Sequence, residues 1–332
     1  MSDKEILEKM VCPYCGKRLD VTELEPLEKF NCPLCDHILQ KNIRFERYDL
    51  VKLCGVGGMA KVYEAIDTLD NKVVAIKIND NDIFEDNQNA ARFIHEAELV
   101  SQINHPGIVK IYRGGIFQHK PFLVMEFMKK GNLESLQKNF MLPDTARILS
   151  WLATIAEGLY EAYKIGIVHH DVKPANIMLS EDGEVKIGDF DLAEISHDGI
   201  HSNESEFASL PYVSPERLIT GTEGYAGDIF SLGVSAYELL TGEYPFGNSG
   251  TPHELLQRRE KSDYMPVRFL NSEIDNRVSN LIDRMMSYNI EDRPSYHEII
   301  NIFRGKEIKQ LKQYDITISG TIKKWFTGNK NS

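Results

Sequence analysis

A short polar stretch in the middle of the chain constrains its fold more than any other feature of the sequence. It contains Asp171, Lys173 and Asn176, and a second acid, Asp189, follows Asp171 by 18 positions. Two carboxylates, an amide and an ammonium group make a compact set for holding metal-bound phosphates beside a hydroxyl group. We therefore expect a site for phosphoryl chemistry, provided that the other parts of such a site occur in the right order.

The stretch resembles the catalytic loop and the metal-binding loop of eukaryotic-type protein kinases. In that family the first Asp accepts the proton of the substrate hydroxyl, and the Asn and the second Asp hold magnesium ions. The resemblance implies that Asp171 is the base and that Asn176 and Asp189 are Mg²⁺ ligands. It also implies that Lys173 provides positive charge near the transferred phosphoryl group.

A glycine-rich turn lies upstream, in a segment from Tyr48 to Lys77 whose pattern is typical of three strands. Glycines allow a backbone to approach phosphate oxygens closely, although the turn alone is equally consistent with an ordinary bulged hairpin. Lys77 is the more specific signal, because a lysine in the apolar run Val74–Lys77 is costly unless it meets an anion. By resemblance Lys77 binds the phosphates of ATP, and Glu96, on the helix expected to follow, pairs with it.

The resemblance also assigns residues to the nucleotide site. Cys54 stands where an aliphatic residue usually covers the adenine, and Ala60 replaces the third glycine of the turn. Met125 guards the deep part of the pocket, while Glu126 and Met128 offer backbone groups to the adenine edge. The residues expected at the nucleotide are Cys54, Gly55, Val56, Gly57, Gly58, Met59, Ala60, Val62, Ala75, Lys77, Met125, Glu126, Met128 and Met178.

Two positions depart from the family's pattern. His170 stands where an Arg commonly pairs with a phosphate on the activation loop, and a His carries only a partial charge near neutral pH. We therefore expect weaker control by loop phosphorylation, with Ser196, Ser202 and Ser205 as candidate sites of self-modification. Asp191 replaces the Gly that closes the metal loop, which narrows the backbone's conformational choice and adds negative charge near the magnesium site.

Further features follow in the order that the family requires. Residues 208–216 resemble the substrate-docking segment, and Arg293 is expected to form a buried ion pair with Glu216 at its end. Asp228 resembles the acid that braces the catalytic-loop backbone. Small-molecule kinases that share the two-lobed core typically lack the docking segment. Ser209 in this segment, together with the catalytic-loop lysine, favours specificity for serine and threonine over tyrosine.

Four of the five cysteines form two C-x-x-C pairs, Cys12 with Cys15 and Cys32 with Cys35, separated by 16 residues. This spacing is typical of a zinc ribbon, in which four thiolates leave no open coordination position, so the Zn²⁺ would be structural. Two disulfides or a rubredoxin-like iron site would use the same residues, although a reducing compartment disfavours disulfides. The acidic linker 20–28 disfavours nucleic acid as the target of the ribbon, and favours a protein partner or a purely structural role.

Composition agrees with a globular protein. The chain has 332 residues, of which 42% are hydrophobic, enough for a large core. Its formal charge of −12 disfavours binding to nucleic acid or to an anionic membrane. No apolar run approaches about 20 residues and the charged start does not resemble a secretory signal, so we expect no membrane span and a cytoplasmic location.

Together these features predict an α+β, two-lobed protein-kinase fold behind a small zinc ribbon, similar to bacterial eukaryotic-like (Hanks-type) serine/threonine kinases. The expected divisions are a ribbon and connector (1–42), a kinase domain with a small lobe (45–128) and a large lobe (129–305), and a C-terminal extension (306–332). The expected activity is transfer of the γ-phosphoryl group of ATP to a protein Ser or Thr hydroxyl, with autophosphorylation. A weak pseudokinase that acts as a scaffold through its ribbon, and a small-molecule kinase, are the alternatives.

Overall fold

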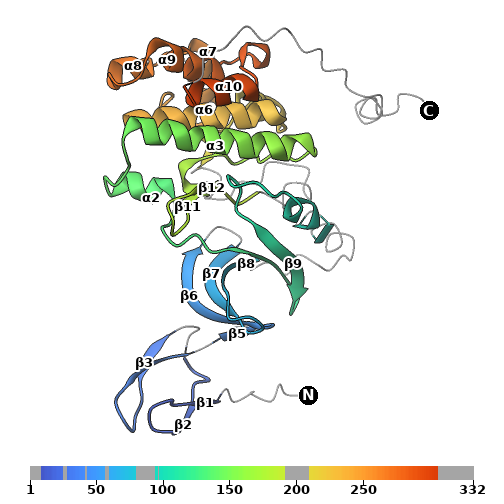
Figure 1. Ribbon diagram of the computed structural model, residues 1–332, viewed down its shortest axis with the longest axis vertical. Helices are drawn as coiled ribbons and strands as arrows, with labels where there is room; N and C mark the ends of the chain where they lie inside the picture. The colour runs from blue at the N-terminus through green and yellow to red at the C-terminus, as the bar shows by residue number, and fades with distance from the viewer. Residues whose placement is uncertain are drawn as a thin grey trace, which may run out of the picture.

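The computed structural model describes residues 9–24, 28–41, 43–56, 60–79, 94–95, 97–190 and 209–305. Within these ranges the chain forms a pair of small hairpins, a curled antiparallel sheet and a larger helical lobe, which follow one another along the long axis of the molecule (Figure 1). The sheet and the helical lobe form the two-lobed fold that the sequence predicts.

The amino-terminal unit consists of two hairpins of the same design. Its strands are β1 (Lys9–Val11), β2 (Arg18–Asp20), β3 (Lys29–Asn31) and β4 (Ile38–Gln40). Each turn holds one C-x-x-C pair and then a residue with positive φ, Gly16 at 73° and Asp36 at 57°. This conformation returns the Gly16 N–H to the Cys12 carbonyl oxygen and the Asp36 N–H to that of Cys32, both at 2.9 Å. The two cysteine pairs are therefore held in matching turns.

Six antiparallel strands form the small lobe, in the order β5-β6-β7-β8-β10-β9. Their bounds are β5 (Ile43–Phe45), β6 (Tyr48–Val56), β7 (Ala60–Asp67), β8 (Val73–Asn79), β9 (Ile111–Phe117) and β10 (Lys120–Glu126). The register places Val62 and Leu123 on either side of Lys77, and Met125 beside Ala75. Lys77 therefore lies on the middle strand of three, among residues that the sequence assigns to the nucleotide site.

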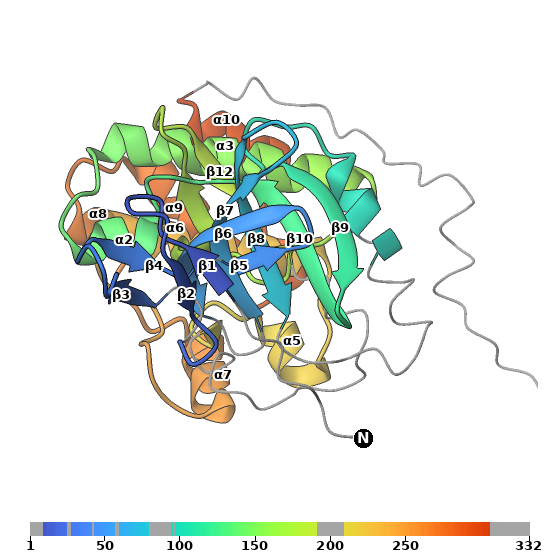
Figure 2. The same cartoon turned by 90° about the horizontal axis from the view of Figure 1, so that it is seen from below.

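The hairpins join the small lobe through a connection of two residues between β4 and β5. Lys41 is buried, its N–H donates to the Glu28 carbonyl oxygen at 2.9 Å, and its ammonium donates to that of Leu24 at 2.7 Å. The Gln40 side-chain amide also donates to the Val51 carbonyl oxygen of β6 at 2.9 Å. Figure 1 and Figure 2 both place the hairpins toward the β6 side of the sheet and away from β9.

The large lobe is mostly helical. Its elements are α2 (Leu133–Lys138), α3 (Thr145–Lys164), β11 (Ile177–Leu179), β12 (Val185–Ile187), α5 (Pro215–Thr220), α6 (Tyr225–Thr241), α7 (Pro252–Lys261), α8 (Val267–Leu270), α9 (Asn276–Met285) and α10 (Tyr296–Phe303). Helix α3 packs against α6 and α10. Every residue of α6 from Ala226 to Leu240 is buried, so this helix is the core on which the lobe's other elements pack.

Some expectations fall on residues outside the described ranges. Of the helix expected to carry Glu96, residues 94–95 and 97–101 are helical, and Glu96 itself is not described. The same holds for the turn residues 57–59, for the segment 191–208 with Asp191 and its three serines, and for the extension after Gly305. None of the helices in the described ranges combines the length and the apolar character needed to cross a bilayer.

Candidate active site

A buried acid from α6 fixes the backbone of the catalytic loop. Asp228 accepts hydrogen bonds from the His169 and His170 N–H groups, each at 2.8 Å, which confirms the predicted brace. The buried His169 ring links the Gly188 carbonyl oxygen, 2.9 Å from Nε2, to the Asp171 N–H, 3.2 Å from Nδ1. These contacts hold His170 at a φ of 67°, a conformation that residues other than glycine rarely adopt.

The carboxylate of Asp171 is oriented by two donors that share one of its oxygens. The Asn176 side-chain amide nitrogen lies 2.8 Å from Asp171 Oδ2 and 2.8 Å from the Asp171 carbonyl oxygen. The Lys173 ammonium lies 2.7 Å from the same Oδ2 and also donates to the Ser209 hydroxyl at 2.6 Å. The Lys173 ammonium therefore binds both the Asp171 carboxylate and the Ser209 hydroxyl.

Asp189 meets a cation from the other lobe. Its carboxylate forms an ion pair with the ammonium of Lys77, which lies 112 positions earlier on β8. Partial burial raises the pKa of Asp189, but Lys77, with His169 and Lys173, outweighs this effect and lowers the pKa below its usual value. Next to it, Phe190 is 5% exposed and packs on the His169 ring, with centroids 4.5 Å apart. Asp189 thus faces the cleft between the lobes while its neighbour is anchored in the core.

The residues assigned to the nucleotide range from buried to exposed. Met125, Met128 and Ala75 are buried, Val62 and Met178 are half-buried, and Cys54 is exposed. The Glu126 N–H donates to the Lys110 carbonyl oxygen at 2.9 Å, so of the two backbone groups of Glu126 only its carbonyl oxygen can serve a nucleotide. Its carboxylate pairs with Lys186 at 2.8 Å. A Cβ on Gly188 would come within 2.5 Å of Met178 Cε and 2.9 Å of Val109 Cγ2, so a larger residue here would require both side chains to shift.

Residues 48–302 match the family model described as the protein kinase domain. The chain belongs to the protein kinase family. Among its relatives, the probable serine/threonine-protein kinase pknA2 of Bifidobacterium longum is 33% identical over 256 residues, which cover 75% of this chain and 33% of that protein. Serine/threonine-protein kinase PknL of Mycobacterium tuberculosis is 36% identical over 210 residues, covering 63% of this chain and 52% of PknL. The chain thus spans about a third to a half of the length of these relatives.

A solved structure agrees on the fold. The crystal structure of a singly substituted mutant of the Mycobacterium tuberculosis PknI kinase domain superposes with a TM-score of 0.61 at 20% identity, covering 79% of this chain and 96% of that one. Identity at this level shows the fold and nothing finer. Protein kinases in general use ATP with magnesium.

The residues of the kinase cleft fit a magnesium ion. The cation prefers oxygen ligands, and carboxylates and side-chain amides both supply them. Because the Asn176 amide nitrogen is committed to Asp171, the Asn176 side chain can offer only its oxygen to a cation. Asp189 offers a carboxylate whose lowered pKa keeps it ionised at neutral pH.

Sequence reasoning missed a charged cluster behind His170. Glu223 is 2% exposed, and its Oε1 lies 3.5 Å from His170 Nδ1 and 3.2 Å from Arg217 Nη1. The same guanidinium donates to the His170 carbonyl oxygen at 2.7 Å, and the Ser214 hydroxyl donates to Glu223 Oε2 at 2.5 Å. A buried carboxylate therefore faces His170 at the position where the family commonly has Arg. No local motif points to Glu223, because its contacts come from packing.

The predicted ion pair at the end of the docking segment is present. Arg293 Nη1 and Nη2 meet the two carboxylate oxygens of Glu216 at 2.7 and 2.8 Å, and the Arg293 side chain is 1% exposed. Burial raises the pKa of Glu216, but the paired guanidinium outweighs it and lowers the pKa. The pair ties α5 to the segment that precedes α10.

The four paired cysteines lie together at the other end of the molecule. Their sulfur atoms all lie within 4.8 Å of one another, with Sγ–Sγ distances of 3.6 Å from Cys12 to Cys35 and 3.7 Å from Cys15 to Cys32. A tetrahedron of sulfurs around Zn²⁺, with Zn–S bonds of about 2.3 Å, has edges of about 3.8 Å. The Leu34 N–H helps to lower the pKa of Cys32 to about 6, whereas at Cys35 the lowering effect of the His37 N–H is outweighed by burial and the neighbouring thiols, which raise the pKa to about 12. Binding of a metal ion would therefore have to displace the proton of Cys35. The spacing of the four sulfur atoms fits a four-thiolate metal site.

Proposed function

We propose that this chain is an ATP-dependent serine/threonine protein kinase that transfers the γ-phosphoryl group of ATP to a protein Ser or Thr hydroxyl, including hydroxyls of its own chain. One observation carries the proposal. Lys77 of the small lobe pairs with Asp189 of the large lobe, and the charge of Lys173 also acts on Asp189. Lys173 and Asn176 in turn both bind the carboxylate of Asp171. These groups come from both lobes, so the cleft between the lobes is the place where a triphosphate would be held.

We assign each residue the role that the resemblance implies, and the contacts of Asp171 support its assignment as the base. Lys77 orients the phosphates of ATP, with Glu96 proposed as its partner on the helix after β8. Asp171, whose carboxylate is turned by Asn176 and Lys173, receives the proton of the acceptor hydroxyl. Lys173 supplies charge to the phosphoryl group in transfer. Magnesium bound at Asn176 and Asp189 would neutralise phosphate charge.

The nucleotide would contact the residues of β6, β7, β8, β10 and β11 whose burial is described above. We assign it the residues expected from the sequence, with the Glu126 carbonyl oxygen and the Met128 backbone at the adenine edge. The proposed divisions are residues 1–42, 45–128, 129–305 and 306–332, and the matched family region lies inside the second and third of them.

Two observations favour a protein acceptor. Kinases of small molecules typically lack a docking segment, whereas here residues 209–216 are ordered against Lys173 and Arg293. The Ser209 hydroxyl also shares the Lys173 ammonium with Asp171, which supports serine and threonine as acceptors. A silent scaffold is disfavoured because the groups needed for chemistry are all in the sequence.

For the hairpin unit we propose a structural zinc ribbon. The support is the near-tetrahedral spacing of Cys12, Cys15, Cys32 and Cys35, together with a small hydrophobic core. In the described part of the unit, its buried members are Leu19, Val21 and Leu39 with Cys12 and Cys32, and Met10, Leu24 and Phe30 pack against them. A protein is the proposed partner of the ribbon, because the chain's acidic balance repels nucleic acid.

The test is transfer of label from γ-labelled ATP with magnesium to myelin basic protein, followed by phosphoamino acid analysis. We expect phosphoserine and phosphothreonine with the wild-type chain, and a loss of roughly 1000-fold or more in Asp171→Asn. Asp182→Asn, an exposed acid in the turn between β11 and β12, is the matched control and should keep wild-type activity. Transfer by Asp171→Asn at the wild-type rate would show that the base is misassigned.

A further inference from the structure

Arg259 of α7 is a buried cation without a carboxylate partner among the described residues. Its side chain is fully buried and lies over the rings of Phe230 and Phe246, 5.5 and 5.8 Å from their centroids. Its Nη2 donates to the Leu210 and Pro211 carbonyl oxygens at 2.6 and 3.1 Å. In the part of the chain that the structure describes, neither Nε nor Nη1 has a hydrogen-bond partner.

Such a residue is not explained by stability. Burial lowers the pKa of Arg259 to about 9, so it remains a cation at neutral pH in a site that disfavours charge. The nearby carboxylates are already paired, Glu216 with Arg293 and Glu223 with Arg217. Replacing a buried, incompletely paired charge by an apolar side chain of similar size is often neutral or stabilising. We therefore look for the role of Arg259 in the two carbonyl oxygens that its Nη2 binds.

These carbonyl oxygens belong to Leu210 and Pro211, in the middle of the docking segment. The segment from Ser209 to Tyr212 is fixed at its start by Lys173, which binds the Ser209 hydroxyl at 2.6 Å. It is fixed at its end by Ser231, which donates to the Tyr212 carbonyl oxygen at 2.8 Å, and by Glu238, which accepts from the Tyr212 hydroxyl at 2.6 Å. Between these anchors, Arg259 binds the two intervening carbonyl oxygens.

We propose that Arg259 is a positioning residue for the protein acceptor: it fixes Leu210 and Pro211 so that the docking segment presents a preformed surface to the acceptor peptide. The inference rests on the proposed kinase function and deepens it. Among the described residues, the contacts of Arg259 are with Phe230, Phe246, Leu210 and Pro211 and not with the nucleotide residues or Asp171, so we assign its effect to acceptor binding. Two hydrogen bonds from one guanidinium to successive carbonyls fix a backbone more tightly than a single point contact.

The test compares Arg259→Met with wild type in steady-state transfer to myelin basic protein. We expect the KM for the acceptor protein to rise roughly tenfold, since two charge-assisted hydrogen bonds are lost. The KM for ATP and the ATP hydrolysis measured without acceptor should stay at wild-type values. The midpoint of thermal unfolding should change by no more than a few degrees, because removal of a buried cation with two unpaired nitrogens offsets the lost hydrogen bonds to the Leu210 and Pro211 carbonyl oxygens.

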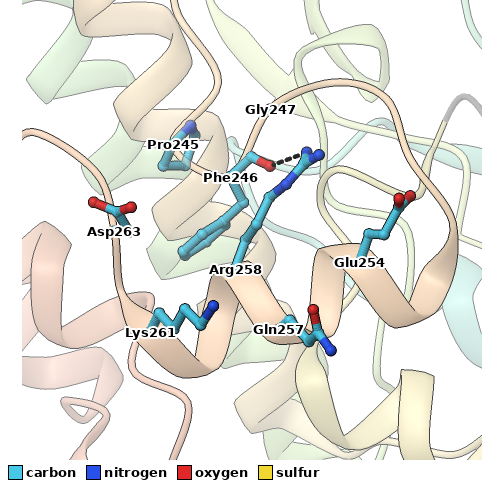
Figure 3. Close-up of a pocket in the computed structure, with 8 residues that line it drawn as sticks. All are labelled: Pro245, Phe246, Gly247, Glu254, Gln257, Arg258, Lys261 and Asp263. Atoms are coloured by element: carbon cyan, nitrogen blue, oxygen red, sulfur yellow. Dashed lines mark hydrogen bonds between the residues drawn. The ribbon is translucent and has the colours of Figure 1, made fainter.

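The neighbouring residue provides the matched control. Arg258 lies on the same helix, is exposed, and donates to the carbonyl oxygens of Phe246 and Ser249 at 3.0 and 2.9 Å. Figure 3 shows its guanidinium directed to Phe246, beside a surface cavity of about 540 Å³ that includes none of the proposed catalytic residues. Arg258→Met makes the same chemical change away from the docking segment and should keep the wild-type KM for the acceptor.

A conservative variant adds a second readout. Arg259→Lys keeps a cation that can reach one of the two carbonyl oxygens, so its KM for the acceptor should fall between those of wild type and Arg259→Met.

Three results would overturn the inference while leaving the kinase function intact. They are an unchanged acceptor KM in Arg259→Met, an equal rise in Arg258→Met, and a large drop in the unfolding midpoint of Arg259→Met, which would assign Arg259 to stability. A wild-type chain that labels no protein would instead overturn the proposed function, and the inference with it.

Discussion

At the scale of single residues, two buried ionised side chains each bind a group of opposite charge. Arg293 is almost fully buried and binds both carboxylate oxygens of Glu216, and Glu223 is buried against Arg217 and Ser214. A buried pair of this kind adds little net stability, but removing one partner leaves an uncompensated charge in the core. The Arg293–Glu216 pair could be predicted from the sequence because both residues lie in recognisable motifs, whereas Glu223 could not.

The first residue-scale prediction concerns Arg293→Met. At pH 7 the free energy of unfolding should fall by about 3 kcal/mol or more, because the buried Glu216 carboxylate loses its partner. The pKa of Glu216 is lowered in the folded state, so its stabilising contribution is present above the unfolded value of about 4.3 and is lost as the pH falls through the folded pKa. The difference between wild type and variant should therefore shrink as the pH is lowered from 7 to below 4.

Urea unfolding at a series of pH values measures this difference. Arg284→Met is the control, since Arg284 pairs with Glu298 at 2.6 Å but its side chain is 49% exposed. That variant should lose less than about 1 kcal/mol. A loss in Arg293→Met that is equally large at every pH would show that Glu216 is not the group involved.

At the scale of elements, the motifs predicted which segments form hairpins, strands and helices, and the contacts between elements came from the structure. The spacing of the four cysteines predicted a ribbon in which the two pairs come together, and the turns of the two hairpins bring their sulfur atoms within 4.8 Å of one another. Nothing in the spacing predicted that Lys41 would be buried in the hairpin unit, or that Gln40 would bind β6. The Gln40 contact depends on how the hairpin unit packs against the small lobe, and the Lys41 contact on how the hairpin unit itself folds. Local sequence patterns do not specify such packing.

The element-scale prediction concerns the metal. The wild-type chain should contain about one zinc per molecule by elemental analysis, and Cys12→Ser should lose most of it, because three thiolates do not complete the shell. The kinase lobes should still unfold near the wild-type temperature, since their cores are separate from that of the hairpins. Cys54→Ser, which changes the fifth, exposed cysteine, should keep its zinc. Iron in the purified protein, or full zinc occupancy in Cys12→Ser, would refute the assignment.

At the scale of the whole molecule, the order of motifs predicted the two-lobed kinase fold, and family membership agrees with it. The order did not predict which distant residues meet. Lys77 and Asp189 are 112 positions apart, and Arg259 binds a carbonyl oxygen 49 positions away. Resemblance assigned Lys77 and Asp189 to the same triphosphate site because both residues belong to motifs, and their direct ion pair came from the structure. The Arg259 contact has no motif, and only the packing of α7 against the docking segment reveals it.

The measurement that tests the central claim most directly is phosphoryl transfer by Lys77→Met, with Lys72→Met as the matched control. Lys72 is exposed in the turn before β8 and its ammonium lies over the Tyr112 ring, so its loss should change the rate by less than about twofold. If the two lobes converge on one triphosphate through Lys77 and Asp189, Lys77→Met should transfer phosphate to myelin basic protein at least roughly 100-fold more slowly than wild type. Transfer by Lys77→Met at the wild-type rate would contradict the account.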